Sequence, residues 1–346
     1  MAKSITDFSS VTTVGLDLAK HVFQVYAIDA AGRVIVGKSI KRQNLLGFFA
    51  SLPACLVGLE ACGSAHHWAR ELIELGHDAR IMPPAYVKPY VRRQKNDAAD
   101  AAAICEAVAR PSMRFVSVRS RENQAVLMRH KAREMLVSQR TQLLNGLRGH
   151  LGEIGVIAAQ GPRHARQLAD LIELHDESIP LEVCEALTEL VVQLRNLDEA
   201  IARLDRAIVK MAQADETTRR LMTIPGFGPI TTSAMVASVQ DASAFEGPRE
   251  FAAFLGLTPR QNSSGGKQRL GHVSKMGNRY LRKLLVVGAH AVLFHRKPHT
   301  DALRMWAKKL IEKKPFKLVA VALANKMARI AFAILRSKTV YREIPT

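Results

Sequence analysis

"SVTTVGLDLA", residues 10–19, is the stretch from which the fold of the chain can be worked out. A short run of β-branched and apolar residues predicts a buried β-strand that ends near Asp17. A carboxylate in such a strand costs much free energy unless it is paired or bound to a metal ion. Asp17 is therefore a candidate functional residue.

The residues that follow continue an α/β pattern up to about residue 120. "VFQVYAID" and "VIVGKSI", joined by the turn "AAGR", predict a meander with the first strand, and "ACLVGLEA", which ends near Glu60, and "DARIMP" predict two more strands. Helices are predicted at "NLLGFFASL", at "SAHHWARELIELG" with Ser64 as N-cap, and at "NDAADAAAICEAVA" with Asn96 or Asp97 as N-cap. Three antiparallel strands, then helix, strand, helix, strand and helix, is the order of an RNase H-like α/β fold.

The last of these helices begins with two carboxylates, Asp97 and Asp100, which share one helix face and repel each other. Taken alone, the pair also fits a capped and solvated helix start, because the helix dipole favours negative charge there. In an RNase H-like order, however, the first strand, the fourth strand and the last helix converge, which brings the pair to Asp17 and Glu60. Four carboxylates together require a cation, and oxygen ligands suit Mg²⁺ or Mn²⁺. Two such ions would stabilise a phosphoryl transfer.

The charge of the chain indicates a polyanionic partner. Its 346 residues include 50 Lys and Arg against 31 Asp and Glu, a net charge of +19. A membrane is disfavoured as that partner, because no signal peptide is evident and the most apolar late stretch contains Lys317, Lys326 and Arg329. The four cysteines form no CxxC pair, which fits a reducing cytoplasm and indicates no zinc site.

Residues 121–218 predict a helical middle region. Residues 121–151 form a long basic pattern without Pro, and "AAQGPRHARQ" interrupts it. Apolar residues then recur at alternating steps of three and four, the pattern of a coiled coil; they are Leu187, Leu190, Leu194, Leu197, Ile201, Leu204, Ile208 and Met211. An antiparallel helical hairpin, a dimerising coiled coil and a helical linker packed within one chain all satisfy this pattern.

Residues 219–346 predict a mainly helical region that contacts nucleic acid. The turn "PGFGP" between two predicted helices presents Gly226 and Gly228 before a helix N-terminus, as in helix-hairpin-helix DNA-binding elements; an ordinary helix–helix turn is the alternative. Residues 256–285, "GLTPRQNSSGGKQRLGHVSKMGNRYLRKLL", contain many basic residues and no acidic one. They predict a flexible, glycine-rich loop that leads into a basic helix and lies on a nucleic-acid backbone.

Several of these motifs resemble those of one family. "VGLDLAK", "VGLEACGS" and "KNDAADAAAICEA" resemble the Asp-Glu-Asp-Asp signature of the DEDD transposases of bacterial insertion sequences, the insertion-sequence one-ten family, which includes the pilin-gene-inverting recombinases. "IPGFGPITTSAMVA" and residues 254–285 resemble the family's C-terminal domain, and "GLTPRQNSSGGKQRLG" is most similar to the one-eleven-eleven subgroup. The resemblance covers nearly the whole chain.

The resemblance implies a RuvC-like domain at residues 1–120 whose four acids bind Mg²⁺, a coiled coil that helps to build a homodimer or homotetramer, and a C-terminal domain with a nucleophilic serine. Family members join that serine covalently to DNA and are guided by a bridge RNA that pairs with donor and target DNA. In "NSSGGK" the serine directly before glycine is Ser264, and Ser263 is its competitor. A serine hydroxyl is a weak nucleophile that needs activation. Whether the chain forms a dimer or a tetramer stays open. It also stays open whether the acids and the serine that act together come from the same subunit (cis) or from different subunits (trans).

Basic residues beside these motifs then become candidate contacts to phosphate and RNA, although each also fits a solvated surface. They are Arg260, Lys267, Arg269, Lys275, Arg279 and Arg282 in the C-terminal region, and Arg92, Arg93 and Lys95 just before Asp97.

Other functions compete with a transposase of the bacterial cytoplasm and nucleoid. A metal nuclease of the Holliday-junction-resolvase type would use the same acids with water as nucleophile. An actin-like ATPase is disfavoured because a later glycine-rich adenosine motif is not evident. A non-catalytic RNA-binding protein leaves the acids without a role.

Overall fold

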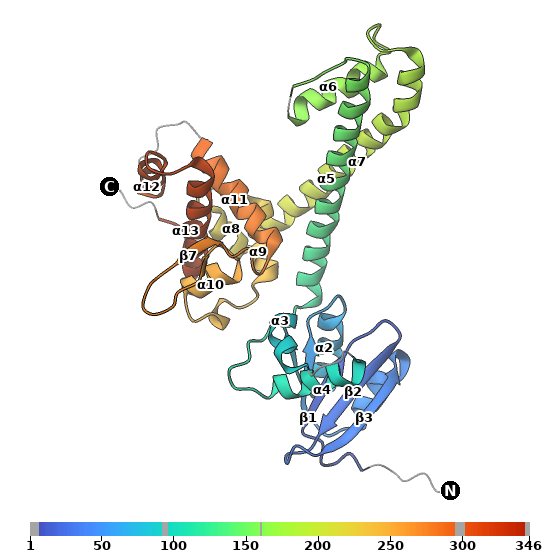
Figure 1. Ribbon diagram of the computed structural model, residues 1–346, viewed down its shortest axis with the longest axis vertical. Coiled ribbons are helices and arrows are strands. Elements are labelled where there is room, and N and C mark those ends of the chain that lie inside the picture. The colour runs from blue at the N-terminus through green and yellow to red at the C-terminus, as the bar shows by residue number, and fades with distance from the viewer. Residues whose placement is uncertain (1–6, 92–95, 160, 295–301, 343–346) are drawn as a thin grey trace. The chain divides into compact units, whose positions relative to one another are not determined.

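The computed structural model describes residues 7–91, 96–159, 161–294 and 302–342. The chain divides into two compact units, Met1–Ser120 and Arg121–Thr346, each of which can be followed in Figure 1. The further division of the second unit at residue 218 remains a prediction.

The first unit is built on the mixed five-stranded sheet that the sequence predicts. Its order is β3-β2-β1-β4-β5, with β1, β2 and β3 antiparallel and β1, β4 and β5 parallel. The strands are β1 (Thr13–Asp17), β2 (Val22–Ile28), β3 (Val34–Lys41), β4 (Leu56–Glu60) and β5 (Asp78–Met82). This mixed sheet and the order of its helices fit the RNase H-like fold that the sequence predicts.

Helices cover both faces of this sheet. Helices α1 (Leu45–Ala50) and α2 (Ala65–Glu74) contribute Phe49 and Trp68 to the core on one face, with Val14 and Leu16 of β1. Helix α4 (Asp97–Val108) packs on the other face, after the short helices α3 (Pro84–Val87) and η2 (Lys88–Tyr90). Asn96 is the N-cap of α4, and its side chain accepts a hydrogen bond from Ala99 N at 2.7 Å. The N-cap prediction for Ser64 was half right, because Ser64 precedes α2 but its side chain makes no cap hydrogen bond.

The second unit begins with two long helices, α5 (Arg121–Glu153) and α7 (Leu181–Ala214). They run antiparallel, since Arg133 pairs with Asp205 and Arg140 pairs with Asp198. The predicted apolar stripe of α7 is largely buried, and near the hairpin end it packs on Leu147 and Leu151 of α5. The structure therefore contains an antiparallel helical hairpin within one chain, and a coiled coil between chains remains a prediction.

Helix α6 (Pro162–Glu173) was not predicted by the sequence pattern. The pattern "AAQGPRHARQ" predicts a break, but Pro162 is at the first helical position, where a missing N–H costs nothing. The apolar side of α6, with Leu168 and Ile172, packs on the end of the α5–α7 hairpin. A third helix thus closes the end of the hairpin.

The rest of the second unit is a helical bundle around α13 (Phe316–Ser337), whose buried face includes Leu323, Met327 and Ala331. The same hydrophobic core includes side chains of α8 (Glu216–Met222), α9 (Pro229–Ser238), α10 (Pro248–Phe254), α11 (Arg279–Phe294) and α12 (Ala302–Ile311). Among the described helices, α13 is the one long and apolar enough to cross a membrane, yet half of its most apolar stretch is buried in this core. Such burial is typical of a core helix.

A β-hairpin projects from this bundle between α10 and α11. Strand β6 (Pro259–Gln261) pairs antiparallel with β7 (Leu270–Val273), and an isolated bridge joins Ser264 to Lys267 near the tip. The sequence predicted a flexible loop here. The structure differs because the adjacent glycines permit a tight turn that pairs the flanking residues.

Candidate functional site: an acidic cluster and a serine hairpin

The sheet places Asp17 and Glu60 next to each other. Strands β1 and β4 are parallel neighbours in register, with Gly15 opposite Gly58 and Leu16 opposite Leu59, so the two acids end adjacent strands. Side chains alternate between the faces of a strand. Asp17 and Glu60 each follow a glycine by two residues and therefore lie on the same face as that glycine, the face that α4 covers.

Two glycines allow α4 to approach this face closely. A Cβ atom on Gly15 would lie 2.1 Å from Ala101 O and 2.5 Å from Cys105 N. A Cβ atom on Gly58 would lie 2.8 Å from Val108 Cβ. Real Cβ atoms do not come so near to other atoms, so α4 can only take this position over glycine. Ala101, which supplies the nearest of these backbone atoms, is buried and adds only a methyl group between helix and sheet.

The close approach brings the first turn of α4 to the end of β1. Carboxylate oxygens of Asp17, Asp97 and Asp100 all lie within 4.8 Å of one another. Asp17 and Asp100 are half-buried and Asp97 is exposed. Within the described residues Glu60 is not a member of this close group, although its strand places it beside Asp17. The structure thus brings three of the four predicted acids together and puts the fourth next to them.

The donor set of this cluster suits a hard divalent cation. All of its ligand atoms are carboxylate oxygens, which Mg²⁺ and Mn²⁺ prefer. Three carboxylates at this separation repel one another strongly, and a cation removes that cost. Asp97 is open to solvent, so a substrate oxygen can reach the same place.

Ser264 lies at the tip of the β-hairpin. Gly265 and Gly266, with φ of 56° and 75°, are the two central residues of the turn, and Lys267 N donates a hydrogen bond to Ser264 O at 3.1 Å. Positive φ at both central residues is the signature of a type I′ turn, which favours glycine. The two glycines that follow the serine are therefore what presents it on a narrow, exposed tip.

The two adjacent serines differ in their contacts. Ser263 Oγ accepts hydrogen bonds from Arg269 N at 3.1 Å and from Gln261 Nε2 at 3.2 Å, so it braces the two strands of the hairpin. The hydroxyl of Ser264 makes no hydrogen bond to any residue that the structure describes. A hydroxyl that holds the backbone is less available for reaction than one that is exposed, so the hydroxyl of Ser264 is the more accessible of the two.

The two glycines of the "PGFGP" turn also differ. Gly226 has φ of 83°, and a Cβ atom there would lie 2.7 Å from Gly288 O of α11. Gly226 therefore has a packing role, which allows the turn to touch the backbone of α11. Gly228 is exposed, is the N-cap residue of α9, and has nothing within 4 Å of a Cβ position. A phosphate contact by either amide stays a prediction, and Gly228 is the better placed.

The predicted basic contacts fall into three groups. Arg260, Lys267, Arg269, Lys275 and Arg279 are exposed on the hairpin or directly after it. Arg282 instead donates hydrogen bonds to Leu255 O at 3.1 Å and Met276 O at 3.0 Å, so it holds the base of the hairpin against α10. Burial lowers the pKa of its guanidinium. Arg92, Arg93 and Lys95 lie outside the described residues.

Sequence reasoning missed a polar network in the second unit. His130 of α5 is 1% exposed; its Nδ1 lies 3.1 Å from Tyr280 Oη and its Nε2 lies 3.0 Å from Ser233 Oγ. These contacts join α5 to α9 and to α11, the helix that follows the serine hairpin. The available signal was weak, because His130 is one of many polar residues in a basic helix with no distinct spacing.

A mixed sheet with acids at the ends of β1 and β4 and at the start of α4 is the arrangement of an RNase H-like domain that acts on nucleic acid. Residues 14–156 match a family model described as a transposase, that of the DEDD domain, and residues 218–304 match the model described as "Transposase IS116/IS110/IS902 family". The chain belongs to the IS116/IS110/IS902 family of transposases and is a DNA transposase.

Relatives agree with this assignment. The chain is 49% identical to a Pseudomonas aeruginosa protein named "Probable family 20 transposase", over 96% of this chain and 99% of that protein. It is 42% identical to the transposase for insertion sequence element IS1111A of Coxiella burnetii, over 96% and 92% of the two chains. It is 28% identical to the pilin gene-inverting protein of Moraxella bovis, over 41% and 45%. The expected resemblance is thereby confirmed.

Proposed function

We propose that this transposase cuts and rejoins DNA with a metal-binding cluster of Asp17, Glu60, Asp97 and Asp100 and with Ser264 as nucleophile. The observation that supports the cluster best is the meeting of Asp17, Asp97 and Asp100 within 4.8 Å, from two segments 80 residues apart in the chain. The four acids would hold Mg²⁺, with Mn²⁺ as a substitute. Bound there, such an ion supplies Lewis-acid stabilisation of the charge that develops on phosphoryl oxygens.

Ser264 would carry the covalent step. Its Oγ attacks the phosphorus of a DNA phosphodiester and loses its proton, while the bond from phosphorus to one deoxyribose oxygen breaks and that oxygen takes up a proton. A hydroxyl of a second strand end then attacks the same phosphorus, and the serine leaves with a proton. No net oxidation occurs and one phosphodiester replaces another. The exposed tip and the uncommitted hydroxyl of Ser264 support this role.

Guidance, assembly and location complete the proposal. We propose that a bridge RNA pairs with donor and target DNA, that the chain works as a homodimer or homotetramer in which a coiled coil takes part, and that it acts in the bacterial cytoplasm at the nucleoid. The exposed basic residues of the hairpin, together with the net charge of +19, support a nucleic-acid partner.

A covalent-adduct assay tests the nucleophile. The protein is incubated with Mg²⁺, its element's RNA and end-labelled donor and target DNA, and the products are separated under denaturing conditions. We expect a labelled protein–DNA adduct with wild type and with Ser263→Ala, and none with Ser264→Ala. An adduct lost only in Ser263→Ala would show that Ser263, and not Ser264, is the nucleophile.

The same assay distinguishes the proposed function from a second candidate, a nuclease. A Holliday-junction-resolvase-type nuclease would use the acids with water as nucleophile, and the exposed position of Asp97 in the cluster is compatible with that. It predicts cleaved DNA with no adduct in any sample. The acid variants Asp17→Asn and Asp100→Asn should abolish cleavage under either mechanism, so they test the cluster independently of the serine.

A further inference from the structure

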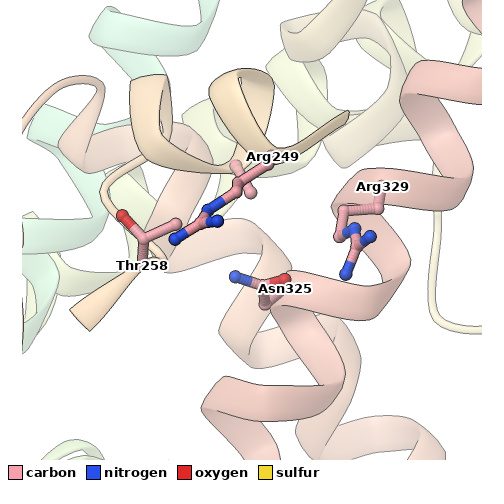
Figure 2. Close-up of a pocket in the computed structure, with 5 residues that line it drawn as sticks. Arg249, Thr258, Asn325 and Arg329 are labelled. Atoms are coloured by element: carbon pink, nitrogen blue, oxygen red, sulfur yellow. The ribbon is translucent and has the colours of Figure 1, made fainter. Parts of the chain in front are cut away.

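A cavity of about 350 Å³ lies in the second unit between α10, α13 and the base of the serine hairpin. It is lined by Arg249 and Ala252 of α10, by Thr258, and by Asn325 and Arg329 of α13. Figure 2 shows the two arginines on either side of Asn325, with Thr258 beside Arg249. Asn325 and Arg329 are four residues apart and therefore share one face of α13.

The polar groups of this cavity have the chemistry of an anion site. Neither guanidinium has a carboxylate partner among the described residues, and no residue of the lining is acidic. Two cations that share a cavity repel each other, so an anion from outside lowers the energy of the site. A guanidinium presents a planar fork that matches phosphate oxygens. Asn325 is held in place, because its Nδ2 donates a hydrogen bond to Leu257 O at 3.1 Å.

An apolar groove continues from the cavity and shares Asn325 and Arg329 with it. The groove has a volume of about 860 Å³, and its walls include Leu257, Pro259, Val273, Trp306, Leu318 and Ile330. Lys326 Nζ lies 4.4 Å from the centre of the Trp306 ring, a cation–π contact, and burial lowers the pKa of Lys326. An anion site beside an aromatic, apolar groove fits a ligand that contains both a phosphate group and a planar aromatic ring.

The location of the groove indicates which class of ligand it binds. Its wall residues Pro259 and Val273 pair at the base of the hairpin that carries Ser264. Ser264 lies five positions after Pro259, a reach of about 17 Å along an extended chain. Residues 251–300 contain no Asp or Glu, so the surroundings favour a polyanion over an isolated metabolite.

We propose that the cavity and groove bind one nucleotide unit of a single-stranded nucleic acid, with a phosphodiester between Arg249 and Arg329 and the adjoining base in the groove near Trp306. The site would hold the strand on the bundle at the base of the hairpin that carries Ser264. The proposal rests on the proposed function for the role of the strand, but its binding chemistry can be measured without any reaction.

Binding is measured on the full chain in EDTA, so that metal-dependent chemistry is absent. The probes are fluorescent single-stranded DNA and RNA of about 12 nucleotides, followed by anisotropy over a range of salt concentrations. Arg249→Gln and Arg329→Gln are compared with Arg219→Gln, an exposed arginine of α8 outside the groove. We expect each cavity variant to weaken binding about tenfold and to reduce the salt slope by about 0.7, with the double variant losing both contacts.

The preference between the DNA and RNA probes identifies which strand the site holds. If the double variant binds both probes as Arg219→Gln does, the cavity is not a phosphate site and the proposal fails. Polyglutamate that competes as well as the oligonucleotides at equal charge would also overturn it, because a general anion surface needs no base pocket.

Photocrosslinking locates the base. A 5-iodouracil oligonucleotide is irradiated with the protein, and the modified peptide is mapped. We expect a crosslink on Trp306 that Arg329→Gln reduces and Arg219→Gln does not; crosslinks confined to other peptides contradict the groove assignment. Ser264→Ala should keep both the binding and the crosslink. The outcome of the adduct assay therefore tests the nucleophile, and the outcome of the crosslinking tests the groove, independently of each other.

Discussion

The buried His130 should make the stability of the second unit depend on pH in a specific way. Ser233 Oγ lies 2.8 Å from Pro229 O and donates its proton there, so it must accept from His130 Nε2–H at 3.0 Å. His130 Nδ1 is then left to accept the hydroxyl proton of Tyr280, at 3.1 Å. The arrangement suits a neutral imidazole. A second proton on the ring would displace the bond from Tyr280.

The surroundings of the ring also favour the neutral form of His130. Burial, with a smaller effect of Arg133 on the same helix, lowers the pKa of His130 from 6.5 to about 4, against an opposing effect of Asp205 on α7. The same burial raises the pKa of Tyr280 of α11 to about 12, so this phenol stays protonated. A histidine whose pKa is lowered on folding contributes stability above its unfolded pKa and loses it as pH falls towards the folded pKa.

The magnitude follows from the two pKa values. Below its unfolded pKa the unfolded chain binds a proton that the folded one excludes, so acid favours unfolding. From pH 8 to pH 5 this one group should cost about 2 kcal/mol of unfolding free energy. Because Tyr280 lies in the first turn of α11, which follows the serine hairpin, the loss of stability should appear in the helical bundle that carries Ser264.

Urea unfolding in a Trp68→Phe background measures this, because Trp306 of the second unit is then the one tryptophan of the chain. We expect wild-type His130 to lose about 2 kcal/mol more between pH 8 and pH 5 than His130→Gln does. His272→Gln, which removes an exposed histidine of β7, is the matched control and should leave the loss unchanged. Equal losses in the His130 chain and His130→Gln would refute the argument.

Three further predictions concern the packing and the acidic cluster. Mg²⁺ at about 100 times its Kd should stabilise the first unit by about 2.7 kcal/mol, measured as a rise in Tm, and Asp100→Asn should lose that rise while it keeps its circular dichroism spectrum. Gly15→Ala should destabilise the first unit by at least about 1–3 kcal/mol in urea unfolding, because its Cβ would meet the backbone of α4; Gly37→Ala on β3, with nothing within 4 Å, is the control. Gly226→Ala should likewise lower the stability of the second unit through its contact with Gly288 and its positive φ, whereas Gly228→Ala should not; equal effects would show that turn propensity and not packing matters.

Much of the first unit could be read from local patterns. Strand alternation and short turns predicted β1 to β5, because each strand records in its own residues which face is buried. The N-terminal cap of α4 was equally local, since Asn96 contacts a backbone amide three residues away. The family motifs extended these local readings to the whole chain.

Other features depend on residues that are far apart in sequence. Helix α6 was missed because an isolated proline and glycine look like a break until the end of the α5–α7 hairpin gives the helix a surface to cover. The serine loop was predicted as flexible, yet Ser263 braces it through Arg269, six residues away. The cavity between Arg249 and Arg329 joins helices that are 80 positions apart, and no local pattern marks it.

The acidic cluster shows most clearly what the sequence determines by itself and what the tertiary structure decides. The residue types, their places at the ends of strands and at a helix start, and the metal they suit were all readable from the order of the chain. That Asp97 and Asp100 reach Asp17 depends on Gly15 and Gly58, which permit α4 to lie directly on two parallel strands. Local sequence sets which groups can bind a cation; the close packing of helix on sheet, a contact between distant segments, sets whether their oxygens meet.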